Sequence, residues 1–477
     1  MLIEHLPEGP DIEADVCIVG AGAAGIVLAL ELMDAGRSVV LLESGGFAKN
    51  ADTQALYDLE TPFLPVKQKS RIRMFGGTTT VWTGGWKPLE RDDFETRDWM
   101  PFSGWPITLA HLEPYYDRAA KLVGGLTTRD FAEAGAVQMA TEFSRGIGES
   151  GGLLTTVLWE MPKKKWDFGK VFRDVLEASS SVRVFLNTNV TDIEKRGTGI
   201  TGLSVKSLEG TGGRVTAGVY VIACGGIENA RLLLHSKIGL EHDQVGRYYM
   251  DHPKGTVGTI HRPDYAVYAP VTGEHYRAGG RLITGFQLTP RFRSEHRIPN
   301  CYVQIRPAYA QHSLARRVAR KFLGVPYTVE GMNLRTFIEQ VPAPHNRVTL
   351  SHIRDAFGNP LPRVEWTLSE LDKEGARQLH RQLQVELARA GLGVLESRVL
   401  ASAEDWPLSS DASHHIGTTR MGYDPKTSVV DANCRVHGVG NLFVAGSSVF
   451  PTGGNANPTA TILALAVRLC DHLKTLP

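Results

Sequence analysis

The sequence of 477 residues is long enough for two or three domains of roughly 150 residues, each with its own core. Lysine and arginine (52) nearly balance aspartate and glutamate (51), so the formal net charge is +1. This balance excludes the broad positive field of a protein that binds nucleic acid without regard to sequence. Glycine accounts for 50 of the 477 residues, about one in ten, whereas its usual share is about 7%. This excess indicates backbone that turns tightly or approaches a ligand closely.

The five cysteines are scattered and form no CxxC pair or Cys/His cluster, so we expect neither a disulfide framework nor a metal site. The first twenty residues lack the basic start of a signal peptide. The apolar stretch 16–33 is interrupted by three glycines and Glu31, which favours strand, turn and helix over a membrane span. We therefore expect a cytoplasmic protein without an integral membrane segment. Two basic segments, 163–165 and 314–324, are interpreted as solvated surface.

The chain opens with a predicted strand at 14–20, a helix at 23–35 and a second strand at 37–43. A strand, a helix and a strand within about 30 residues predict a βαβ unit with parallel strands. The stretch 45–125 is expected to be irregular. Further strands are predicted at 182–195, 203–208 and 215–223, followed by a short helix at 226–236.

Alternating hydrophobic runs between residues 255 and 366 predict an antiparallel sheet. The runs are GTVGTIH, RLITGFQL, CYVQIRP, LRTFIEQV, RVTLS and RVEWTL. A long helix is predicted at 368–391, and the chain closes with a strand (LFVA), a glycine- and proline-rich loop and a helix at 460–473. No repeat or Pro/Ser-rich linker separates these parts, so we expect interleaved domains.

The segment from Gly20 to Gly25 matches the G-x-G-x-x-G pattern between the first strand and the first helix. Its first glycine allows the tight turn, its second lets the backbone approach a pyrophosphate at the helix N-terminus, and its third permits close packing. Glu43 ends the second strand, where a carboxylate accepts hydrogen bonds from an adenosine ribose and disfavours the 2′-phosphate of NADP. A dinucleotide site is predicted, with FAD and NAD both open at this point.

The C-terminal strand, loop and helix favour FAD. The loop at Gly446 and Ser447 and the helix that opens near Pro458 return roughly 400 residues after the fingerprint. An NAD site is usually completed within one contiguous domain, whereas the extended FAD molecule needs a second wall of this kind.

Six motifs considered together point to a known family. They are the fingerprint, RMFGGT (73–78) with Trp82, ACGGIENARLLL (223–234), Gly246-Arg247 with DHP (251–253), HHIGTTRMG (414–422) and PTGGNANPT (451–459). The sequence resembles the glucose–methanol–choline (GMC) family of FAD-dependent alcohol oxidoreductases, with the pattern of pyranose oxidases and bacterial glycoside 3-oxidases.

The resemblance implies an α/β fold in which a Rossmann-like FAD-binding domain is interleaved with a substrate domain on a six-stranded antiparallel sheet. The FAD-binding domain is expected to comprise residues 1–75, 170–255 and 400–477. Residues 76–169 and 256–399 are expected to form the substrate domain and the loops that cover the flavin.

The family's catalytic pair corresponds to His414 and Asn457. A histidine, with an ordinary pKa of about 6.5, suits removal of the hydroxyl proton while a hydride passes from carbon to flavin N5. The Asn457 amide can donate to the forming alkoxide, and His415 is expected to point elsewhere. Val81 stands where some relatives carry a histidine that links FAD, so we expect non-covalent FAD.

The other expected cofactor contacts come from glycine-rich loops and a few side chains. The complete predicted set is Gly20, Gly22, Ala23, Ala24, Gly25, Glu43, Ser44, Arg73, Gly76, Gly77, Thr78, Trp82, Thr83, Gly84, Val190, Cys224, Gly225, Asn229, Gly446, Ser447, Asn457, Pro458 and Thr459. Sugars stack on aromatic rings, so one or two of Trp82, Trp86, Trp99 and Trp105 are expected to line the pocket. The Asp251–Pro253 turn is expected either on the flavin side or in a purely structural role.

The predicted function is oxidation of a hydroxyl of a sugar or glycoside to a carbonyl, with oxygen, a quinone or another electron acceptor. Three alternatives stay open: the same chemistry on a primary alcohol of an amino-sugar or other natural product, an NAD-dependent dehydrogenase, and a flavin-binding protein without turnover. The chain has no G-x-S-x-G, H-E-x-x-H or Walker motif, which excludes the usual hydrolase, zincin and P-loop functions. The sequence leaves the substrate, the electron acceptor and the oligomeric state open.

Overall fold

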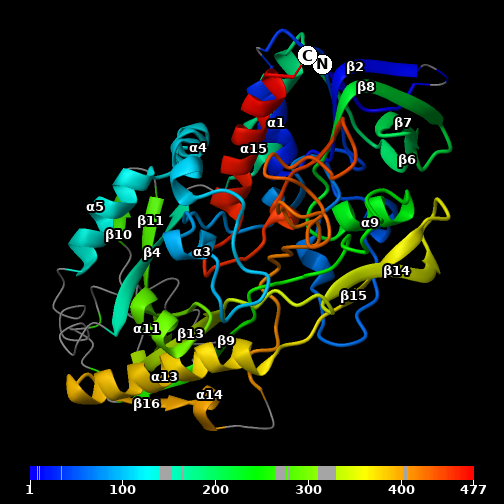
Figure 1. Ribbon diagram of the computed structural model, residues 1–477. Helices are drawn as coiled ribbons and strands as arrows, with labels where there is room; N and C mark the ends of the chain where they lie inside the picture. Colours follow the sequence, from blue (N-terminus) through cyan, green and yellow to red (C-terminus); the bar gives the residue numbers. More distant parts are fainter. Residues whose placement is uncertain are drawn as a thin grey trace, which may run out of the picture.

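Two β-sheets built from interleaved parts of the chain form the framework of the molecule (Figure 1). The computed structural model describes residues 1–7, 9, 11–33, 35–139, 153–162, 166–261, 263, 268, 275–277, 280–309, 329–401 and 406–476. The basic segments 163–165 and 314–324 lie outside these described residues.

The first sheet has eight strands in the order β1-β5-β3-β2-β8-β7-β6, and β17 pairs with the C-terminal end of β8. Its strands are β1 (Leu2–Ile3), β2 (Asp11–Val19), β3 (Val39–Leu42), β5 (Val182–Phe185), β6 (Asn189–Arg196), β7 (Gly199–Lys206), β8 (Gly212–Ile222) and β17 (Leu442–Val444). The strands β1, β5, β3, β2, β8 and β17 pair in parallel, whereas β6, β7 and β8 pair antiparallel.

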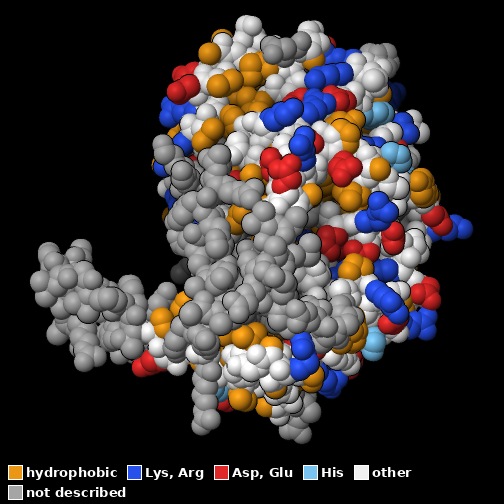
Figure 2. Space-filling view, turned by 90° about the vertical axis from the view of Figure 1, so that its left-hand side faces the viewer, with side chains coloured by type: hydrophobic (Ala, Val, Ile, Leu, Met, Phe, Trp, Pro, Cys, Tyr) orange, Lys and Arg blue, Asp and Glu red, His pale blue; other side chains and the backbone are white. Residues whose placement is uncertain are grey.

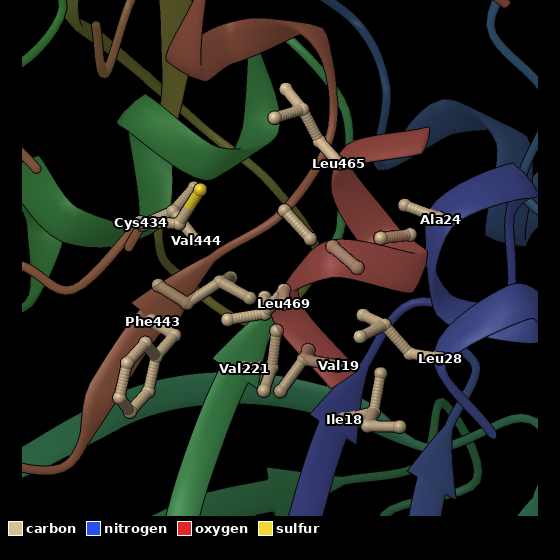
Figure 3. Close-up of a cluster of buried hydrophobic side chains, with 14 of the residues drawn as sticks. Ile18, Val19, Ala24, Leu28, Val221, Cys434, Phe443, Val444, Leu465 and Leu469 are labelled. Atoms are coloured by element: carbon tan, nitrogen blue, oxygen red, sulfur yellow. The ribbon is translucent and has the colours of Figure 1, made fainter. Parts of the chain in front are cut away.

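Two helices distant in sequence, α1 (Ala23–Leu32) and α15 (Thr459–Lys474), pack on one another and on this sheet. Figure 3 shows Leu465 and Leu469 of α15 in one cluster with Leu28 of α1 and Val221 of β8, and Leu469 lies directly above Val221. These four side chains are at most 3% exposed. The C-terminal helix is therefore part of the same core as the first βαβ unit.

The second sheet has seven strands among the described residues, all paired antiparallel. They are β4 (Leu154–Pro162), β9 (Lys254–His261), β10 (His275–Arg277), β11 (Gly280–Leu288), β12 (Cys301–Tyr309), β13 (Val329–Ile338) and β16 (Val394–Ser397). One face of this sheet packs on α13 (Glu370–Arg389) through a core that includes Val303, Leu334, Leu379 and Leu383. Its opposite face is free to line a cavity.

The α/β class and the interleaving of the two parts are confirmed, but the expected six-stranded sheet is wrong in its membership. β4 comes from residues 154–162, and β16 follows α13. The runs RVTLS and RVEWTL instead pair with one another as β14 (Arg347–Arg354) and β15 (Pro360–Glu365), a separate two-stranded sheet. Alternation predicts a strand but carries no information on its partner, which explains the error.

The remaining helices lie around the sheets. They are α2 (Ala51–Ala55), α3 (Arg91–Phe94), α4 (Leu109–Val123), α5 (Thr128–Met139), α7 (Phe168–Val171), α8 (Arg173–Ala178), α9 (Glu228–His235), α11 (Pro290–His296) and α14 (Arg398–Ala401). α4 contradicts the irregular structure expected for 45–125. The Thr108 side chain caps it, and Gly124 in the left-handed region ends it.

The surface agrees with the near-zero net charge. On the face shown in Figure 2, basic and acidic side chains are interspersed and do not form a field of one sign. None of the helices in the described ranges combines the length and the hydropathy needed to cross a bilayer.

Candidate functional site

A cavity of about 1080 Å³ is lined by loops at the end of the first sheet and by the open face of the second sheet. This volume is at the upper end of the roughly 300–1,000 Å³ range of small-molecule sites, so it has room for a large ligand together with a smaller one. The lining comes from segments as distant in sequence as Gly20, Trp82, Gly225, His414 and Asn457. The fold therefore brings most of the sequence-predicted site to one place.

The fingerprint loop forms one wall of the cavity. Gly20 has φ +100°, and a Cβ at this residue would lie 2.8 Å from the carbonyl oxygen of Ala223, so the loop packs directly on the chain that follows β8. Gly22 precedes α1 and lines the cavity, and a Cβ on it would meet no atom within 4 Å. The backbone N–H groups at the start of α1 are thus accessible to an anionic ligand such as a pyrophosphate.

Two other loops present glycines to the cavity in the same way. A Cβ on Gly225 or Gly446 would also meet no atom within 4 Å, and both residues line the cavity. The three open glycines (Gly22, Gly225 and Gly446) come from separate segments yet leave one continuous space, which a side chain on any of them would reduce. This arrangement fits an extended dinucleotide such as FAD.

Glu43 lies where the main cavity meets a smaller one of about 90 Å³, and it lines both. Its carboxylate accepts hydrogen bonds from the N–H groups of Ala21 (2.9 Å) and Gly45 (2.9 Å), and burial raises its pKa. Among the expected cofactor contacts, Ser44, Arg73 and Val190 line only the smaller cavity. These residues lie at the end where the adenosine half of a dinucleotide is expected.

Three of the sequence-predicted residues line neither cavity and instead pack the loops together: Gly25, Gly76 and Asn229. The Asn229 amide donates to the carbonyl of Ala445 (3.0 Å) and accepts from the N–H of Cys224 (2.8 Å). It thereby joins the loop after β8 to the loop after β17. The other expected contacts, namely Gly20, Gly22, Ala23, Ala24, Gly77, Thr78, Trp82, Thr83, Gly84, Cys224, Gly225, Gly446, Ser447, Asn457, Pro458 and Thr459, line the main cavity.

His414 and Asn457 are brought together at the cavity wall. The Nδ2 atom of Asn457 lies 3.1 Å from Nε2 of His414. On the side away from Asn457, Nδ1 of His414 lies 2.9 Å from Nδ1 of His252, and Nε2 of His252 lies 2.9 Å from the carbonyl oxygen of Gly454. His252 lines neither cavity and supports His414 from behind.

This chain of hydrogen bonds assigns the proton positions. The Gly454 carbonyl can only accept, so Nε2 of His252 donates to it and, in a neutral ring, Nδ1 of His252 is an acceptor. Nδ1 of His414 must then donate to His252. Nε2 of His414 is left with its lone pair, which accepts from the Asn457 amide and faces the cavity.

Both rings are neutral near pH 7. Burial lowers the pKa of His252 to about 4. Burial also holds the pKa of His414 well below its usual range, with smaller contributions from the charges of His252, Lys254, His415 and Lys67. The lone pair on His414 Nε2 is therefore available at neutral pH.

The loop that carries His414 is held by Asp251. Its carboxylate accepts hydrogen bonds from the N–H groups of His252 (2.6 Å), Ala412 (2.8 Å) and His414 (3.1 Å). The expectation for Asp251–Pro253 as a flavin-side turn therefore missed its contact with His414, because the separation of about 160 residues gives no local signal.

No metal was expected, yet Asp251, Asp411 and His415 place one possible ligand atom each within 4.8 Å of one another. Both carboxylates already have protein partners, since Asp251 accepts the three N–H groups and Asp411 pairs with Lys67 at 2.9 Å. His415 also borders the cavity, and its buried ring faces Tyr249.

The open face of the second sheet supplies side chains that the sequence reasoning missed. Trp159, Tyr302 and Phe337 line the cavity together with Lys254, Arg306 and Arg335. Of the four tryptophans considered beforehand, only Trp82 does so. The sequences of β12 and β13 could have predicted this cavity-lining face. In both strands polar and aromatic residues alternate with core residues, which are Val303, Ile305, Leu334 and Ile338.

Two protein-family models match this chain. Residues 15–325 match the family model of FAD dependent oxidoreductases, and residues 342–466 match that of GMC oxidoreductases. The chain is 26% identical to the fructose dehydrogenase large subunit of Gluconobacter japonicus, over 97% of this chain and 98% of that protein. It is also 26% identical to 6'''-hydroxyparomomycin C oxidase of Streptomyces lividus, over 96% of this chain and 92% of that protein.

A C-glycoside 3-oxidase of Arthrobacter globiformis is 27% identical, over 76% of this chain and 68% of that protein. Among solved structures, formate oxidase superposes with a TM-score of 0.62 at 17% identity, over 98% of this chain and 99% of that one. At this identity the structural match establishes the fold alone.

The open glycine at position 22 generates a prediction for cofactor binding. Gly22→Val places a branched side chain in the cavity without strain, because Gly22 has φ −87°, so we expect FAD affinity to fall by about 10-fold or more. The measurement is titration of the apoprotein with FAD by flavin fluorescence. Gly212→Val, at the start of β8 with no atom closer than 3.8 Å to its Cβ, is the matched control. Equal FAD affinity in the two variants would contradict the assignment.

Proposed function

The chain belongs to the FAD-dependent oxidoreductases of the GMC family, which act on alcohol groups, and from that premise we propose its reaction. The protein oxidises a hydroxyl group of a sugar or glycoside to a carbonyl. His414 is the base, and Asn457 stabilises the forming alkoxide. FAD, when bound, accepts the hydride from the carbinol carbon.

The observation that carries this proposal is the orientation of His414. Its Nε2 lone pair points into the same cavity that the three open glycines line, and Asn457 lies 3.1 Å from it. A substrate hydroxyl that enters between these two side chains meets an acceptor and a donor at once. Those are the two groups that removal of a hydroxyl proton requires.

Three groups of the chain then have separate roles in the reaction. His414 takes the hydroxyl proton at Nε2 while Nδ1–H stays bonded to His252, so the ring does not rotate during the transfer. The Asn457 amide, released from Nε2, donates to the substrate oxygen as charge develops there. The N-terminus of α15, which begins directly after Asn457 and Pro458, adds positive potential at the same wall.

Support for a sugar or glycoside comes from the relatives that cover most of the chain, which include a fructose dehydrogenase and a C-glycoside 3-oxidase. Trp159, Tyr302 and Phe337 pack on one another, with ring centroids 4.1 and 4.6 Å apart, and give this wall an apolar surface for the carbon face of a sugar ring. The second candidate, a primary alcohol of an amino-sugar, draws on the similarity to 6'''-hydroxyparomomycin C oxidase.

We further propose that FAD is held without a covalent bond through position 81, because the aliphatic Val81 side chain borders the cavity there.

The division into an FAD-binding part (1–75, 170–255 and 400–477) and a substrate part (76–169 and 256–399) also stays a proposal. It is supported by the two sheets, whose strands come almost entirely from those respective segments. A cytoplasmic setting is proposed on the five unpaired cysteines.

The role of His414 predicts the behaviour of His414→Ala. We expect the rate of anaerobic flavin reduction by sugar to fall by about 10² to 10⁴-fold, because alanine removes the proton acceptor that lies beside Asn457. FAD binding should persist, since loop glycines form the cofactor wall. Stopped-flow bleaching of the flavin band measures the rate. Reduction at the full rate in an FAD-loaded variant refutes the assignment.

The lowered pKa of His414 predicts the pH profile. Neutral His414 is the active form, and its fraction declines only when the pH falls below its pKa, which lies well below 6.5. With an uncharged sugar, kcat/KM should therefore stay level from pH 8 to 6.5 and decline at lower pH. A decline already centred at or above pH 6.5 is the contradicting result.

A further inference from the structure

The side of the cavity opposite the fingerprint loop is rich in positive charge. β12 and β13 pair so that Tyr302 lies opposite Phe337 and Gln304 opposite Arg335, and these four side chains all border the cavity. Arg306 lies two residues beyond Gln304, on the same face. Lys254 of β9 lies opposite Phe337 and borders the cavity next to the loop of His414. An aromatic row and a basic row thus run side by side.

The basic side chains lack acidic partners. In the described parts of the chain, no ion pair joins Arg306, Arg335 or Lys254 to a carboxylate. Arg306 instead donates to the Gln304 amide oxygen at 2.6 Å, and Lys254 and Arg335 lie over the Phe337 ring at 5.7 and 5.1 Å. Within the same described ranges, Glu43 is the one carboxylate that borders the main cavity, and it stands at the adenosine end.

Burial and neighbouring positive charges both disfavour the charged forms of these side chains. Burial, with Arg335 and Lys67 nearby, lowers the pKa of Lys254 to about 8, and burial with Arg335 and Arg281 lowers that of Arg306. A pyrophosphate held by the Gly22 loop would lie on the wall formed by the first sheet, whereas these basic side chains belong to strands of the second sheet. An anion placed between the arginines would offset their repulsion and form charge-assisted hydrogen bonds.

We propose that the substrate carries an anionic group, a carboxylate or a phosphate on the sugar or its aglycone, which Arg335 and Arg306 bind while the sugar lies against the wall that they share with Trp159, Tyr302 and Phe337. This inference rests on the proposed function, because it places the oxidised hydroxyl at His414. It also counts against a cationic amino-sugar, since ammonium groups would be repelled by Lys254, Arg306 and Arg335. Arginine forks match carboxylate and phosphate geometry in two parallel hydrogen bonds.

The test compares matched substrates on the FAD-loaded enzyme by anaerobic flavin reduction. One arm pairs phenyl β-glucuronide with phenyl β-glucoside, and a second pairs glucose 6-phosphate with glucose. We expect at least one charged member to exceed its neutral partner in kcat/KM by about 10-fold or more. The arm that shows the preference identifies the anion. Raising the salt concentration should reduce that preference, because screening weakens the attraction.

The arginine variants connect the preference to this wall. Arg335→Gln and Arg306→Gln should each lower the charged-to-neutral ratio of kcat/KM by about 10- to 100-fold. Arg291→Gln is the matched control, because Arg291 is 87% exposed on α11 and, among the residues that the structure describes, forms its ion pair with Glu295. The control should leave the ratio unchanged.

Three results overturn the proposal: neutral partners preferred in both arms, amino-sugars preferred over all others, or a ratio that neither arginine variant changes. In each of these cases a sugar still reduces the flavin, so the proposed function survives. If no sugar of either charge reduces the flavin, the proposed function itself fails and this inference fails with it.

Discussion

The hydrogen bond from His252 to the carbonyl oxygen of Gly454 is the constraint on which the site depends. A carbonyl cannot donate, so this single contact determines which nitrogen of His252 carries the proton and, through it, which nitrogen of His414 is free. The loop PTGGNANPT can pass this close because Gly453 has no side chain. A Cβ there would come within 3.0 Å of His252 Nε2. The same loop carries Asn457 three residues after Gly454, so the carbonyl that accepts from His252 and the amide that donates to His414 are positioned together.

The two ends of the cavity differ in the groups that they present to a ligand. At the end formed by the first sheet, open glycines and the N-termini of α1 and α15 offer backbone N–H groups and helix dipoles. At the end formed by the second sheet, basic and aromatic side chains project from strands held rigidly by α13. His414 lies between them, on a loop whose Ala412 and His414 N–H groups donate to the carboxylate of Asp251.

Much of the fold and part of the site could be predicted from the sequence. The βαβ unit and its fingerprint are local, and strand, turn and helix each leave their own periodic signal over residues 14–43. The return of the chain at Gly446 is predicted by the strand, small-residue loop and helix near the C-terminus, whereas the role of Asn457 is implied by the resemblance to a family. The structure places them around one cavity.

The rest depends on partners distant in sequence. The pairing of β4 with β11, and of β14 with β15 away from the large sheet, follows from packing that alternation does not encode. Helix α4 was missed although Thr108 and Gly124 mark its ends, because its polar residues and internal Pro114 obscure the apolar face. The sequence did not predict the role of His252, since only the folded chain shows that its ring contacts His414 and Gly454.

Neutron diffraction from crystals of the deuterium-exchanged holoenzyme can locate the protons on His252 and His414. We expect deuterium on Nε2 of His252 and on Nδ1 of His414, with none on Nε2 of His414, at pH 7. Deuterium on Nε2 of His414, with Nδ1 bare, would contradict the role of His414 as the base, because that tautomer cannot accept a proton from a substrate in the cavity.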